Sequence, residues 1–244
     1  MEKVFSVSGY QSLLKTALDA GYTFVFFNEP APPGKSCLLR HDIDNDLDAA
    51  MKIAEVEFQL GVKSTFFVML RSPVYNLFGR HNHRCVERIL ELGHQLALHY
   101  DEAFYPDIDR SLQEMIEVEA EILGKMFSRE IKVISFHQPG PRILKNEFKL
   151  KGFINTYDKD DMKGIFYISD SNMVWKHLPA WDLFKSATEN RIQLLIHPMW
   201  WVGDGSQNTE VLWDKALLDN FNRTIDQVFE TEGAFGHRRT VSIR

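Results

Sequence analysis

Six polar residues capable of acid-base or metal chemistry each follow an apolar run that has the composition of a β-strand. They are His41, Asp42, Asp44, His99, His137 and His197. Carboxylates and imidazoles hold divalent cations and move protons near neutral pH. If the strands before them are parallel, their carboxyl ends open on one face and these residues meet there. The sequence therefore predicts an active site assembled from segments that are far apart in the chain.

The aspartates of "LLRHDIDNDLDAA", residues 38–50, divide into two pairs. Asp42 and Asp44 are two residues apart, so on an extended backbone their side chains share a face. One of these carboxylates can bind a divalent cation while the other takes a proton from bound water. Asp46 and Asp48 are expected to be acids at a helix start, where the helix dipole favours negative charge.

The histidines divide in the same way. His94 and His99 differ by an odd number, so on a regular strand they point to opposite faces. His99 is the ligand candidate, and His94, at the strand start, is given a structural role. His137 and His197 each end an apolar strand and closely precede a proline, which turns the chain and holds the imidazole in place. A solvated surface position is expected for His81 and His83 in a polar loop and for His237 near the chain end.

Four tryptophans flank the predicted strand-end loops, namely Trp175, Trp181, Trp200 and Trp201. An indole face is a platform on which a sugar ring can stack, and it is equally a good core-packing group. Both interpretations remain open for each of them at the level of the sequence.

The elements that must position these residues alternate along the chain. Apolar positions at helical spacing predict helices over residues 9–21, 45–61, 85–93, 108–127 and 209–230. Strands are predicted over residues 23–28, 37–41, 63–70, 94–100, 131–137 and 192–201, with a loop over 71–83. Six or seven such strand-helix units favour a closed or partly closed α/β barrel over an open sheet.

Composition limits the remaining possibilities. The chain has 244 residues, 44% of them hydrophobic, which suits a single large domain. A net charge of −6 does not attract nucleic acid or an anionic membrane surface. Two cysteines are too few for a disulfide framework, and no run of apolar residues is long enough to span a membrane. With an acid at position 2 and no long apolar segment behind it, the N-terminus favours a cytoplasmic protein.

Residues 36–200 resemble the polysaccharide deacetylase (NodB-homology) family, in a divergent form of the branch associated with surface-polysaccharide and O-antigen biosynthesis. The resemblance lies in "LLRHDID", "GVKSTFFV", "GHQLALHYD", "SFHQPG" and "LLIHP". It implies a deformed (β/α) barrel of about seven strands. Residues 1–244 would then form one catalytic domain whose core is 36–200.

By this resemblance Asp42 is the general base, Asp44 and His99 are metal ligands, and His197 is the general acid. The family usually has two metal-binding histidines four residues apart, but position 103 is Ala103. We expect His137 to be the third ligand, with Asp101 or Glu102 as the alternatives. The family's aspartates are usually adjacent, whereas "HDID" separates them, so which one is base and which is ligand stays open.

The function expected from the resemblance is removal of an acetyl group from an N- or O-acetylated sugar, with a divalent ion, Zn²⁺ above all, as cofactor. The substrate would be an acetylated sugar, sugar nucleotide or oligosaccharide. Two alternatives are a glycan-binding protein that has lost catalysis and a metal hydrolase acting on a small amide or a phosphate ester, because a fold does not fix its substrate. The sequence leaves the sugar, the acyl group and the oligomeric state open.

Overall fold

A computed structural model describes residues 4–104, 111–203, 205 and 208–237. Its centre is a sheet of parallel strands in which seven follow the order β6-β5-β4-β3-β2-β8-β7. These are β2 (Lys35–Ile43), β3 (Thr65–Val68), β4 (Gln95–Tyr100), β5 (Val133–Phe136), β6 (Ile154–Asn155), β7 (Phe166–Ser169) and β8 (Arg191–Ile196). An eighth strand, β1 (Tyr22–Phe24), pairs with the first residues of β2. The sheet forms a half-barrel, so the prediction of a deformed (β/α) barrel of about seven strands is confirmed.

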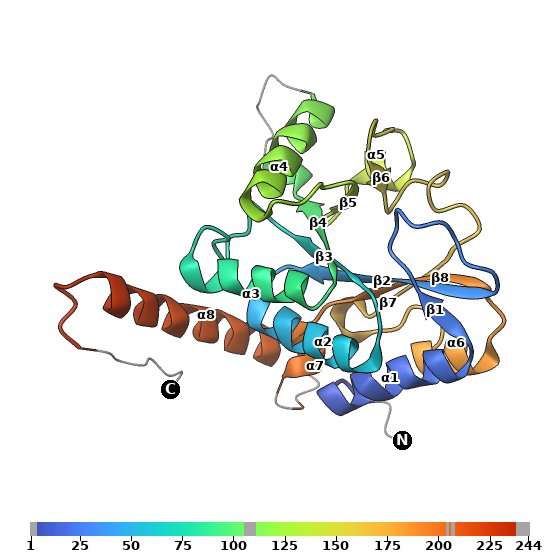
Figure 1. Ribbon diagram of the computed structural model, residues 1–244, viewed down its shortest axis with the longest axis horizontal. Helices are drawn as coiled ribbons and strands as arrows, with labels where there is room; N and C mark the ends of the chain where they lie inside the picture. The colour runs from blue at the N-terminus through green and yellow to red at the C-terminus, as the bar shows by residue number, and fades with distance from the viewer. Residues whose placement is uncertain (1–3, 105–110, 204, 206–207, 238–244) are drawn as a thin grey trace.

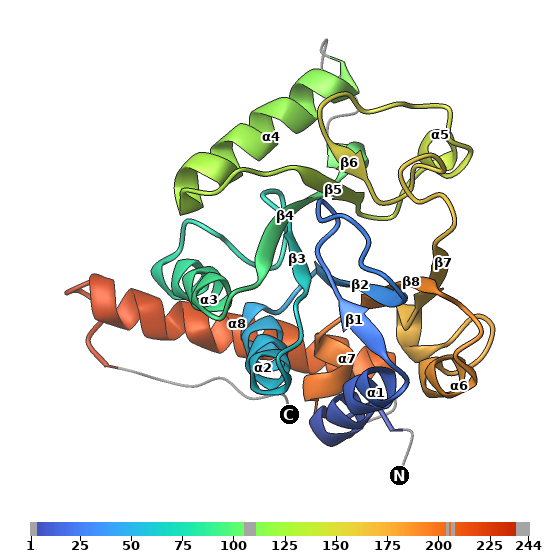
Figure 2. The same cartoon turned by 45° about the vertical axis from the view of Figure 1, so that its right-hand side comes forward.

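Helices cover the outside of this sheet (Figures 1 and 2). The longer ones are α1 (Val7–Asp19), α2 (Leu47–Leu60), α3 (Arg80–Glu91), α4 (Leu112–Phe127) and α8 (Thr209–Thr231). Shorter ones are α5 (Pro141–Leu144), α6 (Ala180–Ser186) and α7 (Met199–Val202), with two 3₁₀ turns at Glu102–Phe104 and Ser171–Met173. Helix α8 extends beyond the sheet on one side (Figure 1). Within the described residues, no helix is both long enough and apolar enough to cross a membrane.

The two faces of the sheet differ in chemistry because side chains alternate along each strand. The outward face packs against the helices in two large apolar clusters, one around α2, α3 and α4 and the other around α1, α6 and α7. The inward face has a smaller apolar cluster that includes Leu38, Phe67, Ala97 and Val133. Leu38 is followed at two-residue intervals by Arg40 and Asp42, so β2 presents charge to the inside of the half-barrel.

Local sequence explains where α2 begins and ends. The Asp46 carboxylate accepts hydrogen bonds from the N–H groups of Asp48 and Ala49, which caps the first turn. Gly61 ends the helix with a φ of 67°, a left-handed conformation that glycine adopts without steric cost. Both boundaries agree with the predicted helix over 45–61. The helical spacing of Leu47, Ala50, Met51, Ala54 and Phe58 predicts one apolar face, but Phe58 is 57% exposed and does not pack into the core.

Three predicted boundaries are also wrong. Helix α3 begins at Arg80, so His81 and His83 lie on a helix and not in a loop. Strand β8 ends at Ile196, because Pro198 has helical backbone angles and is the N-cap of α7. Strand β1 ends at Phe24, because the chain turns between Phe26 and Glu29. Residues 108–110 of the predicted helix over 108–127 lie outside the described residues, and α4 itself begins at Leu112 behind a Ser111–Glu114 capping box.

Candidate active site

Asp44, His99 and His137 come together at the carboxyl ends of β2, β4 and β5. His99 Nε2 and His137 Nδ1 each lie 3.2 Å from Asp44 Oδ1. One ligand atom from each residue falls within 4.8 Å of the others. His99 is buried, and its Nδ1 lies 2.6 Å from Ser135 Oγ on the neighbouring strand, which fixes the ring with Nε2 toward Asp44. The fold thus places a carboxylate and two imidazoles as a convergent donor set.

Asp44 Oδ1 provides a test of whether these residues suit a cation. This oxygen is buried, and among the described residues its only close polar neighbours are the two imidazole nitrogens at 3.2 Å. One carboxylate oxygen facing two ring nitrogens is an arrangement that a divalent ion between them would satisfy. Burial would raise the pKa of Asp44, but contact with His137 and His99 holds it well below its usual range. The same contact raises the pKa of His137.

Asp42 lies beside this group on the inward face of β2, in a buried ion pair. Arg40 Nε and Nη2 donate to its two carboxylate oxygens at 2.8 and 2.7 Å. The guanidinium also donates to Thr156 and Tyr157 and lies between the rings of Phe67 and Tyr157. Burial would raise the pKa of Asp42, but Arg40 outweighs this and lowers it. Asp42 is therefore a carboxylate at neutral pH, and His99 Nε2 lies 3.7 Å from its Oδ2.

His197 follows β8 and is held by Asp170, which follows the adjacent strand β7. Asp170 is fully buried and lies 2.7 Å from His197 Nδ1, while it also accepts hydrogen bonds from the His197 backbone N–H and the Trp201 indole. His197 Nε2 is therefore left facing Asp44, with 3.9 Å between it and Oδ2. Burial would lower the pKa of His197, but the charge and hydrogen bond of Asp170 raise it to about 9. The imidazole is thus protonated at neutral pH.

These groups line a cavity of about 730 Å³, a size suited to a small-molecule ligand. Its walls include Tyr157, Tyr167, Trp213 and Lys176. Gln138, between His137 and the following proline, also lines it and has a φ of 42°, a conformation that costs a non-glycine residue energy and is frequent at functional sites.

The tryptophans suggested as sugar platforms are mostly core residues. Trp181 and Trp201 are buried in the cluster around α1, α6 and α7. Trp200 is 4% exposed but contributes to the cavity wall, and Trp175 is half-buried against Trp181 and Trp201. Trp213, which the sequence did not single out, is the half-buried indole in the cavity wall.

His41 does not join the site, which corrects its grouping with the strand-end residues. It lies within β2 and points to the outward face, where its Nε2 is 2.6 Å from Glu57 Oε1. Glu57 is fully buried and also accepts hydrogen bonds from Tyr10 and Ser64. His94 completes this group through Ser64, as its structural assignment anticipated. The cause is the two-residue alternation that sends Asp42 inward and His41 outward.

Asp48 and His81 form a second group of polar side chains, with Cys85. His81 Nε2 lies 3.0 Å from both carboxylate oxygens of Asp48, and Cys85 Sγ lies 3.7 Å from that nitrogen. The Arg223 guanidinium is 3.1 Å from Asp48 Oδ2, and burial raises the pKa of the Cys85 thiol to about 12. Because a guanidinium already pairs with this carboxylate and the thiol stays protonated, we interpret the group as an ion-pair network that joins α2, α3 and α8 and not as a metal site.

The alternatives for the third ligand lie differently. Asp101 Oδ1 accepts a hydrogen bond from the Ala103 N–H, which caps the turn at that point. Glu102 Oε1 accepts one from the Gly140 N–H, on the loop after His137. Neither belongs to the convergent group around Asp44 among the described residues. The assignment of Asp42, Asp44, His99, His137 and His197 to their roles stays a prediction.

Sequence reasoning missed Arg40 and Asp170, which hold the two residues assigned to acid-base chemistry. Asp170 ends "FYISD", an apolar run followed by an acid, so the strand-end signal was present there. Arg40 carried no such signal, because a charge inside an apolar strand shows its partner only once the strand's inward face is known.

No protein-family model matches the chain, and no curated protein matches it either. Among solved structures, the chain resembles a family 4 carbohydrate esterase from Bacillus anthracis, with 16% identity over 86% of each chain and a TM-score of 0.44. It resembles the catalytic domain of a peptidoglycan N-acetylglucosamine deacetylase from Eubacterium rectale, with 17% identity over 78% of this chain and 87% of that one, at a TM-score of 0.47.

A CE4 family pseudoenzyme from Bacillus anthracis is also similar, with 13% identity over 79% of this chain and 63% of that one and a TM-score of 0.43. The names of these neighbours thus include a carbohydrate esterase, a deacetylase and a pseudoenzyme. Identities below 20% and TM-scores below 0.5 do not assign this chain to a family or an activity. Its function is therefore inferred from its own residues.

Proposed function

We propose that the protein is a metal-dependent deacetylase that acts on an acetylated sugar. The observation that supports this most strongly is the convergence of His99 and His137 on one buried oxygen of Asp44, with Asp42 and His197 beside it. One carboxylate and two neutral imidazoles form a donor set that suits Zn²⁺ and leaves positions open for water and substrate. Asp44 is the ligand in this proposal because it is closer than Asp42 to the histidines.

A divalent ion bound there would lower the pKa of a bound water and polarise an acetyl carbonyl. The remaining steps fall to the chain's own residues. Asp42, kept ionised by Arg40, accepts the proton of the attacking water, since each of its oxygens retains a lone pair beyond those used by the guanidinium. His197, protonated and oriented by Asp170, presents Nε2 toward Asp44 and donates the proton that the departing sugar nitrogen or oxygen requires.

Metal content and acetate release test the proposal on the same preparations. We expect close to one divalent ion per chain after dialysis, and acetate release from acetylated sugars, sugar nucleotides or oligosaccharides. Asp44→Ala and His99→Ala should lose the ion. Asp42→Asn and His197→Ala should retain it and lose about 10²–10⁴-fold in turnover. His83→Ala, on α3, is a matched control that should change neither quantity.

Each outcome has a defined meaning. A purified chain without a stoichiometric ion would refute the hydrolase and leave a glycan-binding protein. Turnover of simple amides without acetate release from any acetylated sugar would refute the deacetylase. If Asp42→Asn is the variant that loses the ion, the roles of the two aspartates are reversed. We further propose that the protein acts in the cytoplasm, in the biosynthesis of surface polysaccharide or O-antigen.

A further inference from the structure

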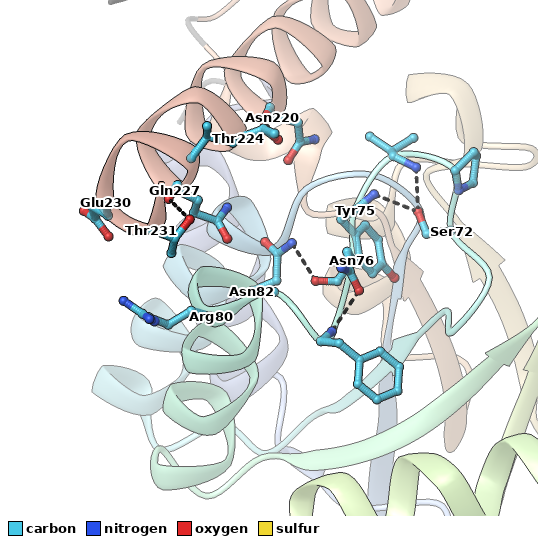
Figure 3. Close-up of a pocket in the computed structure, with 15 residues that line it drawn as sticks. Ser72, Tyr75, Asn76, Arg80, Asn82, Asn220, Thr224, Gln227, Glu230 and Thr231 are labelled. Atoms are coloured by element: carbon cyan, nitrogen blue, oxygen red, sulfur yellow. Dashed lines mark hydrogen bonds between the residues drawn. The ribbon is translucent and has the colours of Figure 1, made fainter. Parts of the chain in front are cut away.

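A second cavity, of about 750 Å³, lies between the loop over residues 71–79, the start of α3 and the outer half of α8 (Figure 3). It lies outside the wall of the cavity that contains Asp44, because the two share no lining residue. Its size falls within the range of small-molecule pockets, and nothing in the proposed chemistry uses it.

The polar part of its lining consists mainly of amides and hydroxyls. Asn82 on α3 faces Gln227 and Thr224 on α8 across the cavity (Figure 3). Asn82 Nδ2 donates to the Asn76 carbonyl, which leaves Asn82 Oδ1 without a partner among the described residues. Gln227 Nε2 makes only a long contact, 3.4 Å, with the Arg223 carbonyl, and its Oε1 is likewise unpartnered there. Asn82 Oδ1 and the Gln227 amide are therefore available to a ligand.

The apolar and charged residues of the lining further limit the class of ligand that the cavity suits. Phe78 is 69% exposed, so the loop holds an aromatic ring in solvent at the cavity. Arg80 and Glu230 contribute one charge of each sign, so the lining is neutral overall. A planar amide offers donors and acceptors in one plane, which matches adjacent hydroxyls, and an aromatic face packs against an apolar ring face. A neutral, polyhydroxylated ring compound fits this combination.

The cavity is connected to the segment that carries Asp44. Tyr75, whose ring lines the cavity, donates its hydroxyl proton to the Ile43 carbonyl at 2.7 Å. Asn220 Nδ2, from α8, donates to the Asn45 carbonyl at 2.8 Å, and Ser72 Oγ lies 3.4 Å from the Asp44 carbonyl. Three consecutive carbonyls are thus bonded to side chains of the cavity wall. Movement of the loop against α8 on ligand binding would be transmitted to this backbone.

We propose that this cavity is a binding site for a neutral saccharide, separate from the cavity that holds Asp44 and in contact with the backbone of residues 43–45. The inference does not depend on the proposed deacetylase activity. Ligand hydroxyls pair with Asn82 Oδ1 and with the amide group of Gln227, and a sugar ring packs on Phe78.

Titration of the ¹⁵N-labelled full-length protein with cellobiose, after removal of metal by a chelator, tests the site without turnover. We expect saturable amide shifts in residues 72–82 and 220–231, with smaller shifts in 43–45. Gln227→Leu and Phe78→Ala should each weaken binding by about tenfold, the effect of one lost contact of this kind. Both side chains contribute little to folding, since one makes a single long hydrogen bond and the other is exposed.

Two variants on α2 serve as matched controls. Gln59→Leu and Phe58→Ala replace an exposed glutamine and an exposed phenylalanine away from the cavity, and both should leave binding unchanged. Absence of saturable shifts, or shifts confined to the residues that line the Asp44 cavity, would overturn the proposal. Unchanged binding in both Gln227→Leu and Phe78→Ala would overturn it as well.

Discussion

Asp170→Asn removes one negative charge from a fully buried position while it keeps the shape of the side chain and an acceptor for the Trp201 indole. The change acts on His197, whose Nδ1 lies 2.7 Å from the carboxylate. Burial opposes the protonated imidazole, so its charge depends on neighbouring carboxylates, of which Asp170 contributes most. We therefore expect the variant to lose the imidazolium near neutral pH.

The size of the effect follows from the pKa of His197, which is raised from 6.5 to about 9. This shift corresponds to about 3 kcal/mol between the two protonation states. Without the Asp170 charge, burial should move the pKa back down toward 6.5, with Asp44 and Asp42 still acting to raise it. Complete loss of the shift would lower the protonated fraction at pH 8 from roughly nine tenths to roughly three hundredths, so about 30-fold is the upper limit for the loss of the acid form.

Imidazole resonances followed by NMR from pH 5 to pH 10 in the chelated protein measure this pKa directly. Turnover gives the second measurement, with the alkaline limb of the pH-rate profile moving to lower pH in the variant. Asp214→Asn, an exposed position on α8, is the control and should leave both curves in place. A pKa for His197 that stays near 9 in Asp170→Asn would refute the reasoning, because a group other than Asp170 would then be stabilising the protonated imidazole.

Arg40→Met should destabilise the fold by about 3–5 kcal/mol in denaturant titrations, because it leaves the Asp42 charge buried and unpaired, and the double variant with Asp42→Leu should recover most of that loss. Acid should destabilise the native protein, since the pKa values of Glu57 and His94 are both lowered on folding. Their contributions to the free energy of unfolding are complete above the unfolded pKa values and are lost as the pH falls below about 6.5 for His94 and about 4.5 for Glu57. Glu57→Gln should therefore flatten the lower part of the curve of stability against pH. An unchanged slope in that variant would contradict this. Gly61→Ala should cost about 1 kcal/mol in thermal unfolding, because Gly61 has a φ of 67°; no loss would mean that the end of α2 rearranges freely.

The sequence alone determined the local features of this protein. Apolar runs located most of the sheet strands, and the polar residue after each run identified Asp44, His99, His137 and His197 as neighbours at one end of the sheet. Asp46 and Gly61 defined the limits of α2, as caps and left-handed positions do in any context. These features depend on the spacing of apolar side chains along a helix or strand and on the residues that end the element. Both can be read from neighbouring positions in the sequence.

The tertiary structure decided which groups meet. It turned His41 outward to Glu57, paired Arg40 with Asp42, and placed Asp170 behind His197. It also buried three of the four tryptophans that the sequence suggested as sugar platforms, and it formed a cavity whose wall is hydrogen-bonded to the backbone of residues 43–45. Strand order, inward or outward direction and the partner of each buried charge are set by the whole sheet, because the cost of burying a charge is met only by groups that distant segments bring to it.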